Sequence, residues 1–441
     1  MPLTQLCTKT FLTAVAAIAI VSSSTANRAA AQASDSEFSK IFDGKTLEGW
    51  HGRPHIHPEK YAEATEEPKA KWAEELKTHW TVDGDELVND GHGAYMTTNE
   101  EFGDMEMKLK YKTVALADSG IYLRGTPQVQ IWDTTEEAKF GLGANLGSGA
   151  LWNNSPGTAG KDPLVKADKP FGEWNEVHVI QVGSRTTVKL NGELVVDNAI
   201  MENFWDRSIP LIAKGPIQLQ THGGEIRWKD IEVRRIGPDE ANSILASKNT
   251  AGFEPIFDGT TLAGWKGSVD DYEVVDGAIQ CRKGRGGNLY TEEEMDRYVV
   301  RAEFQVPPGG NNGFAIHYSG QGNPAHDGLT ELQVLDHEHP KYGKLDPRQA
   351  HGSAYGMVAA KKGYLREIGQ WNFQEMTIDG AKIKVELNGN VILDADLSEV
   401  KEFMGDQKHP GIDRRSGHFG FAGHSDPVRF RNLSVRKLPA Q

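Results

Sequence analysis

Several residues in the last third of the chain are of the types that carry acid–base chemistry. Glu331 and Gln333 are two positions apart in the stretch TELQVLD, so on a β-strand they share one face while the leucine and valine pack on the other. Asp336 has the opposite parity and joins them only through a bulge or at the strand end. His317 and His424 complete the group. Carboxylates and imidazoles are the usual general acids and bases of enzymes.

The same pattern also has a purely structural interpretation. A glutamate and a glutamine that alternate with apolar residues are typical of the solvated face of an exposed sheet. His424 could cap a turn instead of moving protons. Both interpretations stay open at the level of these residues alone.

These residues lie in a sequence that occurs twice in the chain. The stretch FSKIFDGKTLEGW, which starts at Phe38, returns as FEPIFDGTTLAGW from Phe253. Further pairs keep the same order: Asp118-Ser-Gly120 with Asn311-Asn-Gly313, Trp174-Asn175 with Trp371-Asn372, and His222 with His424. Ordered matches of this kind predict a duplicated domain of about two hundred residues. The two copies are expected over residues 38–236 and 253–438.

Hydrophobic residues within each copy recur with a period of two. The stretch MEMKLKYK from Met105 alternates apolar and polar residues, as do IKVEL from Ile383 and VRFRNLSV from Val428. Such alternation predicts half-buried antiparallel strands, and the Leu-Asn-Gly of each copy predicts a hairpin turn. The expected fold is all-β, with two jelly-roll β-sandwiches in tandem.

Two segments depart from this pattern. Residues 51–79 form an insert in the first copy only, and their run of helix-forming residues predicts a short surface helix. Residues 237–252 are polar and rich in small residues, which predicts a linker between the two copies.

The N-terminal residues have the features of an export signal. Lys9 precedes an apolar run from Phe11 to Val21, and the small residues that follow end in Ala31-Gln32-Ala33. This arrangement predicts a signal peptide over 1–33, cleaved near Ala33, and a secreted or periplasmic protein. No later stretch reaches the roughly 18 apolar residues of a membrane-spanning helix, so we expect no integral membrane segment in the mature chain.

The net charge bears on nucleic-acid binding, and the cysteine content bears on disulfide bonds. The net charge is −14, so the chain has no basic footprint for nucleic acid. Cleavage of the signal peptide removes Cys7 and leaves Cys281 alone, so the mature protein is expected to have no internal disulfide.

Taken in order, the motifs F-DG-TL-GW, W-V-DG, (N/D)-(S/N)-G, E-x-Q-x-x-D, WN, LNG, H and FRN resemble those of the 3-keto-disaccharide hydrolase domain family. The resemblance covers both copies and nearly the whole mature chain. It implies a concanavalin A-like jelly roll in each copy. It also implies an enzyme that acts on 3-keto-glycosides, with a carbohydrate as its partner.

The reaction that this resemblance implies requires particular groups in the active site. A ketone at C3 of a sugar acidifies the hydrogen on C2, so a general base can remove that proton and the enolate can expel the aglycone from C1. Water then adds to the enone, and the net reaction is hydrolysis. The site needs a base and a cationic or hydrogen-bonding group for the enolate oxygen. The residues expected to be catalytic are Glu331, as the base or its positioning group, with Gln333, Asp336, His317 and His424.

The first copy differs at the central position. Gln128 stands where the second copy has Glu331, and an amide cannot act as a base, so Asp133 or His222 would have to serve instead. Tryptophan faces stack on sugar rings and amides bond their hydroxyls, although core packing would equally account for the tryptophans. The residues expected to bind substrate in this copy are Arg124, Gln128, Gln130, Trp132, Asp133, Trp152 and His222.

Two histidine-rich stretches could hold a divalent metal ion, although the sequence requires no cofactor. One comprises His51, His55 and His57 with Glu59, and the other His337-Glu338-His339 with His351. Neither has the i, i+4 helical spacing of a zinc enzyme, and solvated surface loops account for both.

Two other functional classes remain open. The first is a non-catalytic, lectin-like carbohydrate-binding protein, because the expected fold hosts lectins and glycanases alike. The second is a conventional glycoside hydrolase on a glucanase-like fold. A retaining enzyme of that class needs two carboxyl groups about 5–5.5 Å apart, whereas Glu331 shares its strand face with Gln333, which makes this class the less favoured.

Overall fold

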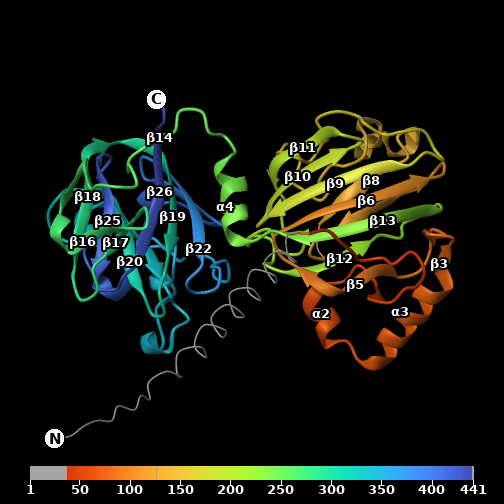
Figure 1. Cartoon of the computed structure of the whole chain (residues 1–441), viewed down its shortest axis with the longest axis horizontal. Helices are drawn as coiled ribbons and strands as arrows, with labels where there is room; N and C mark the ends of the chain where they lie inside the picture. Colours follow the sequence, from red (N-terminus) through yellow and green to blue (C-terminus); the bar gives the residue numbers. More distant parts are fainter. Residues whose placement is uncertain (1–36, 126, 440–441) are drawn as a thin grey trace, which may run out of the picture.

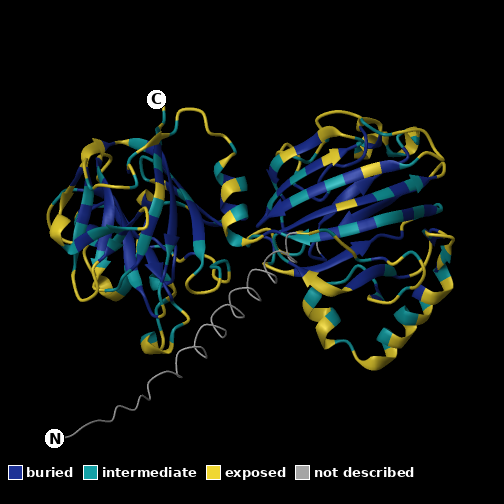
Figure 2. Ribbon diagram, in the orientation of Figure 1, coloured by how far each residue is buried: buried dark blue, intermediate teal, exposed yellow. Residues whose placement is uncertain are grey.

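The computed structural model describes residues 37–125 and 127–439, and the signal peptide expected over 1–33 lies outside the described residues. Two β-sandwiches lie next to one another, each built from one larger and one smaller antiparallel sheet (Figure 1). Buried residues lie mostly in the strands, whereas exposed residues lie mostly in the connecting loops and helices (Figure 2). The expected all-β fold, with two jelly rolls in tandem, is confirmed.

The first domain contains an eight-stranded sheet and a five-stranded sheet. The larger follows the order β11-β10-β9-β6-β13-β4-β3 with β1 paired to β13, and the smaller follows β2-β5-β12-β7-β8. The strands are β1 Ser39–Lys40, β2 Trp50–Arg53, β3 Trp80–Asp83, β4 Glu86–Asn89, β5 Tyr95–Phe102, β6 Met105–Thr113, β7 Ser119–Tyr122, β8 Gln128–Ile131, β9 Asn175–Val182, β10 Arg185–Leu190, β11 Glu193–Ile200, β12 Gly215–Leu219 and β13 Ile226–Arg235. Short 3₁₀ helices follow β8 at Glu137–Leu142 and Ala144–Leu146.

The second domain repeats this topology strand for strand. Its sheets follow β16-β17-β26-β19-β22-β23-β24, with β14 paired to β26, and β15-β18-β25-β20-β21. The strands are β14 Glu254–Pro255, β15 Trp265–Gly267, β16 Tyr272–Val275, β17 Ala278–Cys281, β18 Gly286–Met295, β19 Arg297–Gln305, β20 Asn311–Tyr318, β21 Thr330–Leu335, β22 Trp371–Asp379, β23 Lys382–Leu387, β24 Asn390–Asp396, β25 Gly417–His424 and β26 Arg429–Lys437. Helix α5 spans Pro324–Asp327, and 3₁₀ turns lie at Val269–Asp271, Pro340–Tyr342, Pro347–Gln349, Leu397–Glu399 and Met404–Asp406. Strands β7 and β8 therefore correspond to β20 and β21.

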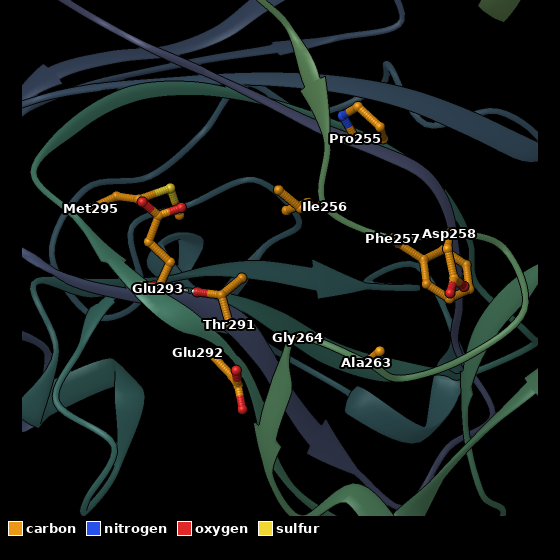
Figure 3. Close-up of a pocket in the computed structure, with 10 residues that line it drawn as sticks. All are labelled: Pro255, Ile256, Phe257, Asp258, Ala263, Gly264, Thr291, Glu292, Glu293 and Met295. Atoms are coloured by element: carbon orange, nitrogen blue, oxygen red, sulfur yellow. Dashed lines mark hydrogen bonds between the residues drawn. The ribbon is translucent and has the colours of Figure 1, made fainter.

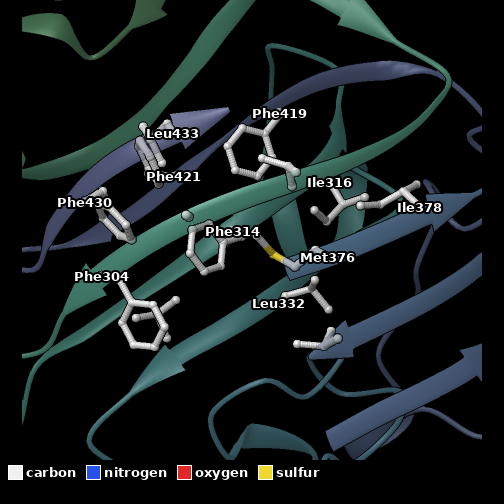
Figure 4. Close-up of a cluster of buried hydrophobic side chains, with 14 of the residues drawn as sticks. Phe304, Phe314, Ile316, Leu332, Met376, Ile378, Phe419, Phe421, Phe430 and Leu433 are labelled. Carbon is white, nitrogen blue, oxygen red and sulfur yellow. The ribbon is translucent and has the colours of Figure 1, made fainter. Parts of the chain in front are cut away.

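Each domain has its own hydrophobic core between its two sheets. In the second domain the rings of Phe421 and Phe430 stack at 4.0 Å, and Phe421 also stacks on Trp265 at 5.2 Å. Phe314 and Phe419 join the same cluster (Figure 4). The alternation seen in the sequence supplies these residues, because every second side chain of a strand points between the sheets.

The repeated DG-TL-GW motif is a structural device. Asp258 accepts hydrogen bonds from the backbone N–H groups of Thr260 and Thr261 and from the Thr261 hydroxyl, and these bonds lower the pKa of Asp258 below its usual value. The Trp265 indole donates to the Ile256 carbonyl at 3.0 Å. Asp258 borders a cavity of about 560 Å³ (Figure 3), but its oxygens are already occupied by its own turn.

Within residues 37–125 and 127–439, helices α2, α3 and α4 lie outside the two sandwiches. The insert of the first domain forms α2 (Pro58–Glu63) and α3 (Glu66–His79) (Figure 1). Helix α3 packs beside β2. The segment 237–252, expected as a linker, contains α4 (Pro238–Ala246). Its buried Ala241 and Leu245 pack with Val182 of the first domain and Phe373 of the second, so α4 forms a small hydrophobic cluster with residues of both domains. No helix in residues 37–125 and 127–439 is long and apolar enough to cross a bilayer.

The two domains meet through hairpin turns. The β9–β10 turn of the first domain lies against the β23–β24 turn of the second, where the Ser184 N–H donates to the Gly389 carbonyl at 3.1 Å. The Ser184 hydroxyl donates to the Asn390 side chain at 2.8 Å. Beside them, Arg185 forms a bidentate salt bridge with Glu386, in which Nε donates to Oε1 at 2.8 Å and Nη2 donates to Oε2 at 2.5 Å.

Candidate functional site

The five-stranded sheet of the second domain carries a polar cavity of about 330 Å³. Strand β21 lies at the edge of this sheet, paired with β20 so that Ala315 opposes Glu331 and Gly313 opposes Gln333. The pleat turns Leu332 and Val334 into the core and leaves Glu331 and Gln333 on the other face. The lining consists of polar and aromatic side chains with a few small or apolar ones: Asn311, Asn323, Ala325, His326, Glu331, Gln333, Leu335, Tyr342, Leu345, Gln349, Tyr355, Gln407 and His424.

Glu331 is the central residue of this cavity. Its side chain is buried, and its Oε1 accepts no hydrogen bond from the part of the chain that the structure describes. The Nε2 of His424, whose side chain is half exposed, lies 3.9 Å from that oxygen. The interaction with Glu331 raises the pKa of His424, against the opposing effect of burial. The pair thus combines a free carboxylate oxygen, which can take a proton, with an imidazole that favours its charged form.

A glycine gives the glutamate its place. A Cβ on Gly313 would lie 2.0 Å from the Glu331 Oε1 and 2.3 Å from its Cγ, so Glu331 lies flat across the neighbouring strand where that strand has no side chain. The matching Gly120 of the first domain has the same relation to Gln128, whose Oε1 would lie 3.0 Å from a Cβ. The Gly of the (N/D)-(S/N)-G motif is thus required by close packing.

Gln333 offers hydrogen bonds to a ligand beside Glu331. Its Nε2 donates to the Asn311 Oδ1 at 2.8 Å, which fixes the orientation of the amide. Its Oε1 is buried and without a partner among the described residues. Buried acceptors of this kind cost free energy until a donor reaches them, and the hydroxyl of a ligand would be such a donor.

The structure does not bring the other two residues of the expected catalytic group to this cavity. Asp336 is buried and its Oδ2 accepts the N–H of Gly309 at 2.7 Å, which makes it a support for the loop before β20. His317 is fully buried, with a φ of 46°, because the pairing of β20 with β25 shifts register between Ala315 and Tyr318. Its Nε2 bonds the Asp296 carbonyl at 2.8 Å, and burial lowers its pKa.

Arg124 of the first domain stands at the position that matches His317 in the repeat, also with a positive φ, of 53°. Its guanidinium is buried and donates to the Ile212 carbonyl at 2.9 Å, beside Asp104 at 3.4 Å. Asp133 accepts the N–H of Leu116 at 2.7 Å and bonds made by Thr135. Both side chains thus hold backbone segments in place.

The two tryptophans form a separate pair. The rings of Trp132 and Trp152 meet edge to face at 6.1 Å, and Trp132 is buried. The Trp152 indole donates to the Leu142 carbonyl at 3.2 Å, and the Lys161 ammonium lies over its ring. Gln128, Gln130 and His222, in contrast, lie in one hydrogen-bonded cluster centred on Asp118.

The sequence reasoning did not single out Asp118 or Asn311 as site residues. Both stand at the first position of the (N/D)-(S/N)-G motif, and the exchange of acid for amide there was the available signal. The first domain has an acid and an amide at these two positions, Asp118 and Gln128, and the second has an amide and an acid, Asn311 and Glu331. Each domain therefore has one carboxylate in the pair.

The histidine-rich stretches have other surroundings than a metal site. Among residues 37–125 and 127–439 no group of three or more His, Cys, Asp or Glu side chains is arranged to hold a metal ion. His57 caps α2, and His55 packs among aromatic rings. Burial lowers the pKa of His351 to about 3.

Two tandem sandwiches, each with a histidine and a carboxylate on its five-stranded sheet, define a concanavalin A-like protein with two polar faces. The chain belongs to the family of 3-keto-alpha-glucoside-1,2-lyase-like domains, which it matches over residues 37–234 and 252–436. The family expected from the motifs, in two copies, is confirmed.

Several known proteins are similar to part of the chain. A 3-keto-disaccharide hydrolase of Bacteroides thetaiotaomicron is 28% identical over 243 residues, which are 45% of this chain and 83% of the relative. A candidate glycosyl hydrolase of Parabacteroides distasonis is 23% identical, with a TM-score of 0.39, over 42% of this chain and 99% of that one. The carbohydrate-binding module CBM66 of Bacillus subtilis is 11% identical, with a TM-score of 0.29, over 40% of this chain and 98% of that one.

Proposed function

We propose that the second domain cleaves 3-keto-glycosides, with Glu331 as the general base. The observation that carries the proposal is the buried Oε1 of Glu331, which has no hydrogen-bond partner among the described residues and lies 3.9 Å from the His424 imidazole in a polar cavity. Membership of the family and the name of the Bacteroides relative support this choice of substrate class.

The reaction can be written with every atom in place. The Glu331 carboxylate takes the proton from C2, and the electron pair of the C2–H bond forms the enolate with the C3 carbonyl. The enolate then expels the aglycone oxygen from C1, and this oxygen takes a proton from the His424 imidazolium. Water adds to the resulting enone, with its hydroxyl on C1 and its proton on C2, and the proton that Glu331 took passes to His424, 3.9 Å away, which restores both groups. The products are the free 3-keto-sugar and the aglycone alcohol.

The neighbouring side chains have supporting tasks. Gln333 and Asn311 are placed to bond sugar hydroxyls beside the base, because their amides are already aligned by the bond between them. Tyr342 and Tyr355 add aromatic surface to the lining, which suits the C–H face of a pyranose. Among the lining residues in the described part of the chain, Glu331 is the one carboxylate, which disfavours a glycosidase with two catalytic carboxylates.

The test compares a 3-keto-glucoside with its unoxidised parent. We expect aglycone release from the 3-keto compound alone, slowed when the C2 hydrogen is replaced by deuterium and proton removal limits the rate. Release from both substrates would indicate a conventional glycosidase. Glycan binding without any turnover would favour the lectin-like alternative.

A further inference from the structure

The five-stranded sheet of the first domain carries a second polar cluster, on the face that corresponds to the Glu331 cavity. Asp118 is buried just before β7, with its Oδ2 2.9 Å from the Nδ1 of His222 and 3.1 Å from the Nζ of Lys139. Its Oδ1 accepts the Nε2 of Gln130 at 2.8 Å. In the repeat, Asp118 stands where the second domain has Asn311. The carboxylate of the first domain therefore lies just before β7, whereas that of the second domain lies on β21, the partner of β20; both domains have the matching histidine.

The Asp118 carboxylate differs from that of Glu331 because both of its oxygens have hydrogen-bond or ion-pair partners. Burial alone would raise the pKa of Asp118, but the hydrogen bond from His222 and the charge of Lys139 hold it below its usual value. A carboxylate with three partners and a lowered pKa is a weak base. The cluster therefore lacks the free carboxylate oxygen with which Glu331 can remove a proton from carbon.

The side-chain amides of Gln128 and Gln220, which are buried beside Asp118, each have an oxygen without a hydrogen-bond donor among the described residues. Gln128 is 3% exposed and donates its Nε2 to Gln130, and Gln220 is 5% exposed and donates its Nε2 to the Tyr95 hydroxyl at 3.3 Å. The Oε1 atoms of Gln128 and Gln220 have no hydrogen-bond partner among the described residues. Unpaired buried acceptors are costly, and hydroxyl groups of a polyol would satisfy both.

Aromatic rings adjoin the amides. The ring of Tyr95 lies 5.6 Å from that of Tyr122, and His55 packs on Tyr122 at 5.0 Å and on Trp205 at 4.7 Å. His55 comes from the insert 51–79, which the second copy lacks. Amides flanked by aromatic faces are the combination that binds a pyranose, because the rings pack on C–H groups while the amides bond hydroxyls.

We propose that the first domain holds a second sugar site, which binds a pyranose through Gln128, Gln220 and His222 but does not cleave it. Asp118 positions the His222 ring and the Gln130 amide, and the aromatic residues of the insert side pack on the sugar. The identity of the sugar as a 3-keto-glucoside rests on the proposed function, whereas the site itself rests on the contacts above.

Calorimetric titration of a 3-keto-glucoside into the Glu331→Gln chain tests this proposal, because that variant should not consume the ligand. We expect two binding sites per chain. Gln220→Ala should raise the dissociation constant of one of them about three- to tenfold, the usual effect of one hydrogen bond. Gln333→Ala should weaken the other site by a similar factor.

One site per chain, sensitive to Gln333→Ala and not to Gln220→Ala, would overturn the proposal, as would the absence of any binding. If Gln220→Ala lowers the melting temperature, His222→Ala replaces it, because that side chain is 58% exposed and its removal should leave the fold intact. Two-site binding without turnover by the natural chain would remove the proposed function and leave the second site standing. Turnover together with single-site binding would do the reverse.

Discussion

Glu331 and Asp118 show how the partners of a buried carboxylate decide what it can do. Within the described part of the chain, the Glu331 Oε1 has no hydrogen-bond partner and lies 3.9 Å from the His424 imidazole. Asp118 contacts His222, Lys139 and Gln130 at 2.8–3.1 Å. The first arrangement suits proton abstraction, and the second suits fixed hydrogen bonding.

The Glu331→Gln substitution tests the role of the base directly. Glutamine keeps the shape and the hydrogen bonding of the side chain but cannot take a proton, so aglycone release should slow by about 10²–10⁴, the usual contribution of a general base. Binding of the 3-keto-glucoside should persist, as measured by calorimetry. Gln128→Ala at the matching position of the first domain is the control, and it should leave the chemical step of single-turnover release nearly intact. Full activity in Glu331→Gln would move the base elsewhere.

The pH dependence should report His424. The pKa of this imidazole is raised above its ordinary 6.5 by Glu331, so the charged form persists above pH 6.5 and is lost as the pH rises through the raised value. If His424 protonates the leaving group, aglycone release should fall along that limb. An NMR titration should place the pKa of His424 lower in Glu331→Gln than in the natural chain. An unchanged titration would contradict the pairing.

The same shift has a consequence for stability. Because the folded pKa of His424 exceeds the unfolded one, its contribution is fully present below about pH 6.5 and is lost as the pH rises through the folded value.

At the scale of the elements, the pairing of β20 with β21 determines where Glu331 lies. The side chain crosses Gly313, and the close approach of 2.0 Å to a Cβ built there leaves no space for a methyl group. The strand pair therefore acts as part of the site, although Gly313 itself has no chemical function.

Gly313→Ala should inactivate the second domain without removing any reacting group. The added methyl group would displace the Glu331 carboxylate, so we expect a loss of activity of at least tenfold, since small displacements of a catalytic group are costly. Gly120→Ala is the matched comparison, because its methyl group would lie 3.0 Å from both the Gln128 Oε1 and the Val129 carbonyl oxygen, a milder overlap than the 2.0 Å at Gly313. Aglycone release and circular dichroism should be measured for both. Equal, small effects in the two variants would argue against this role of Gly313.

At the scale of the whole molecule, the two sandwiches are held in contact by their hairpin turns and by α4. The Arg185–Glu386 pair spans the contact, with Glu386 7% exposed. Close packing of the turns supports it, since a Cβ on Gly183 would lie 2.1 Å from the Asn388 carbonyl oxygen. The domains are therefore expected to unfold together.

Arg185→Ala should destabilise this contact. It leaves the Glu386 carboxylate largely buried without its partner, which should cost about 1.5–3 kcal/mol, the range for a hydrogen bond to a charged group. Calorimetry should show a lower first melting temperature and a separation of the two transitions. Lys437→Ala, which removes an exposed pair with Glu293, is the control and should have no measurable effect. A single unshifted transition in Arg185→Ala would mean that the pair does not couple the domains.

The larger features of the protein were determined locally and could be read from the sequence. Alternation with a period of two places Met105, Met107 and Leu109 in the core of the first domain, because each strand buries one face whatever its neighbours are. The ordered repeat predicted two copies of one fold, and the strand parity placed Glu331 with Gln333. These inferences need only the spacing of residues along the chain.

The roles of the other polar residues were decided by contacts between distant segments. A register shift in β20 turns His317 to the Asp296 carbonyl, 21 residues away, and Asp336 is occupied by the N–H of Gly309, 27 residues away. Asp118 finds His222 across 104 residues. A polar side chain is available to a ligand only if it is not already hydrogen-bonded to a backbone group or paired with an opposite charge. Which of these partners lies nearby depends on the tertiary structure. For this reason the sequence could identify the candidates, whereas the folded chain decided which of them are free to act.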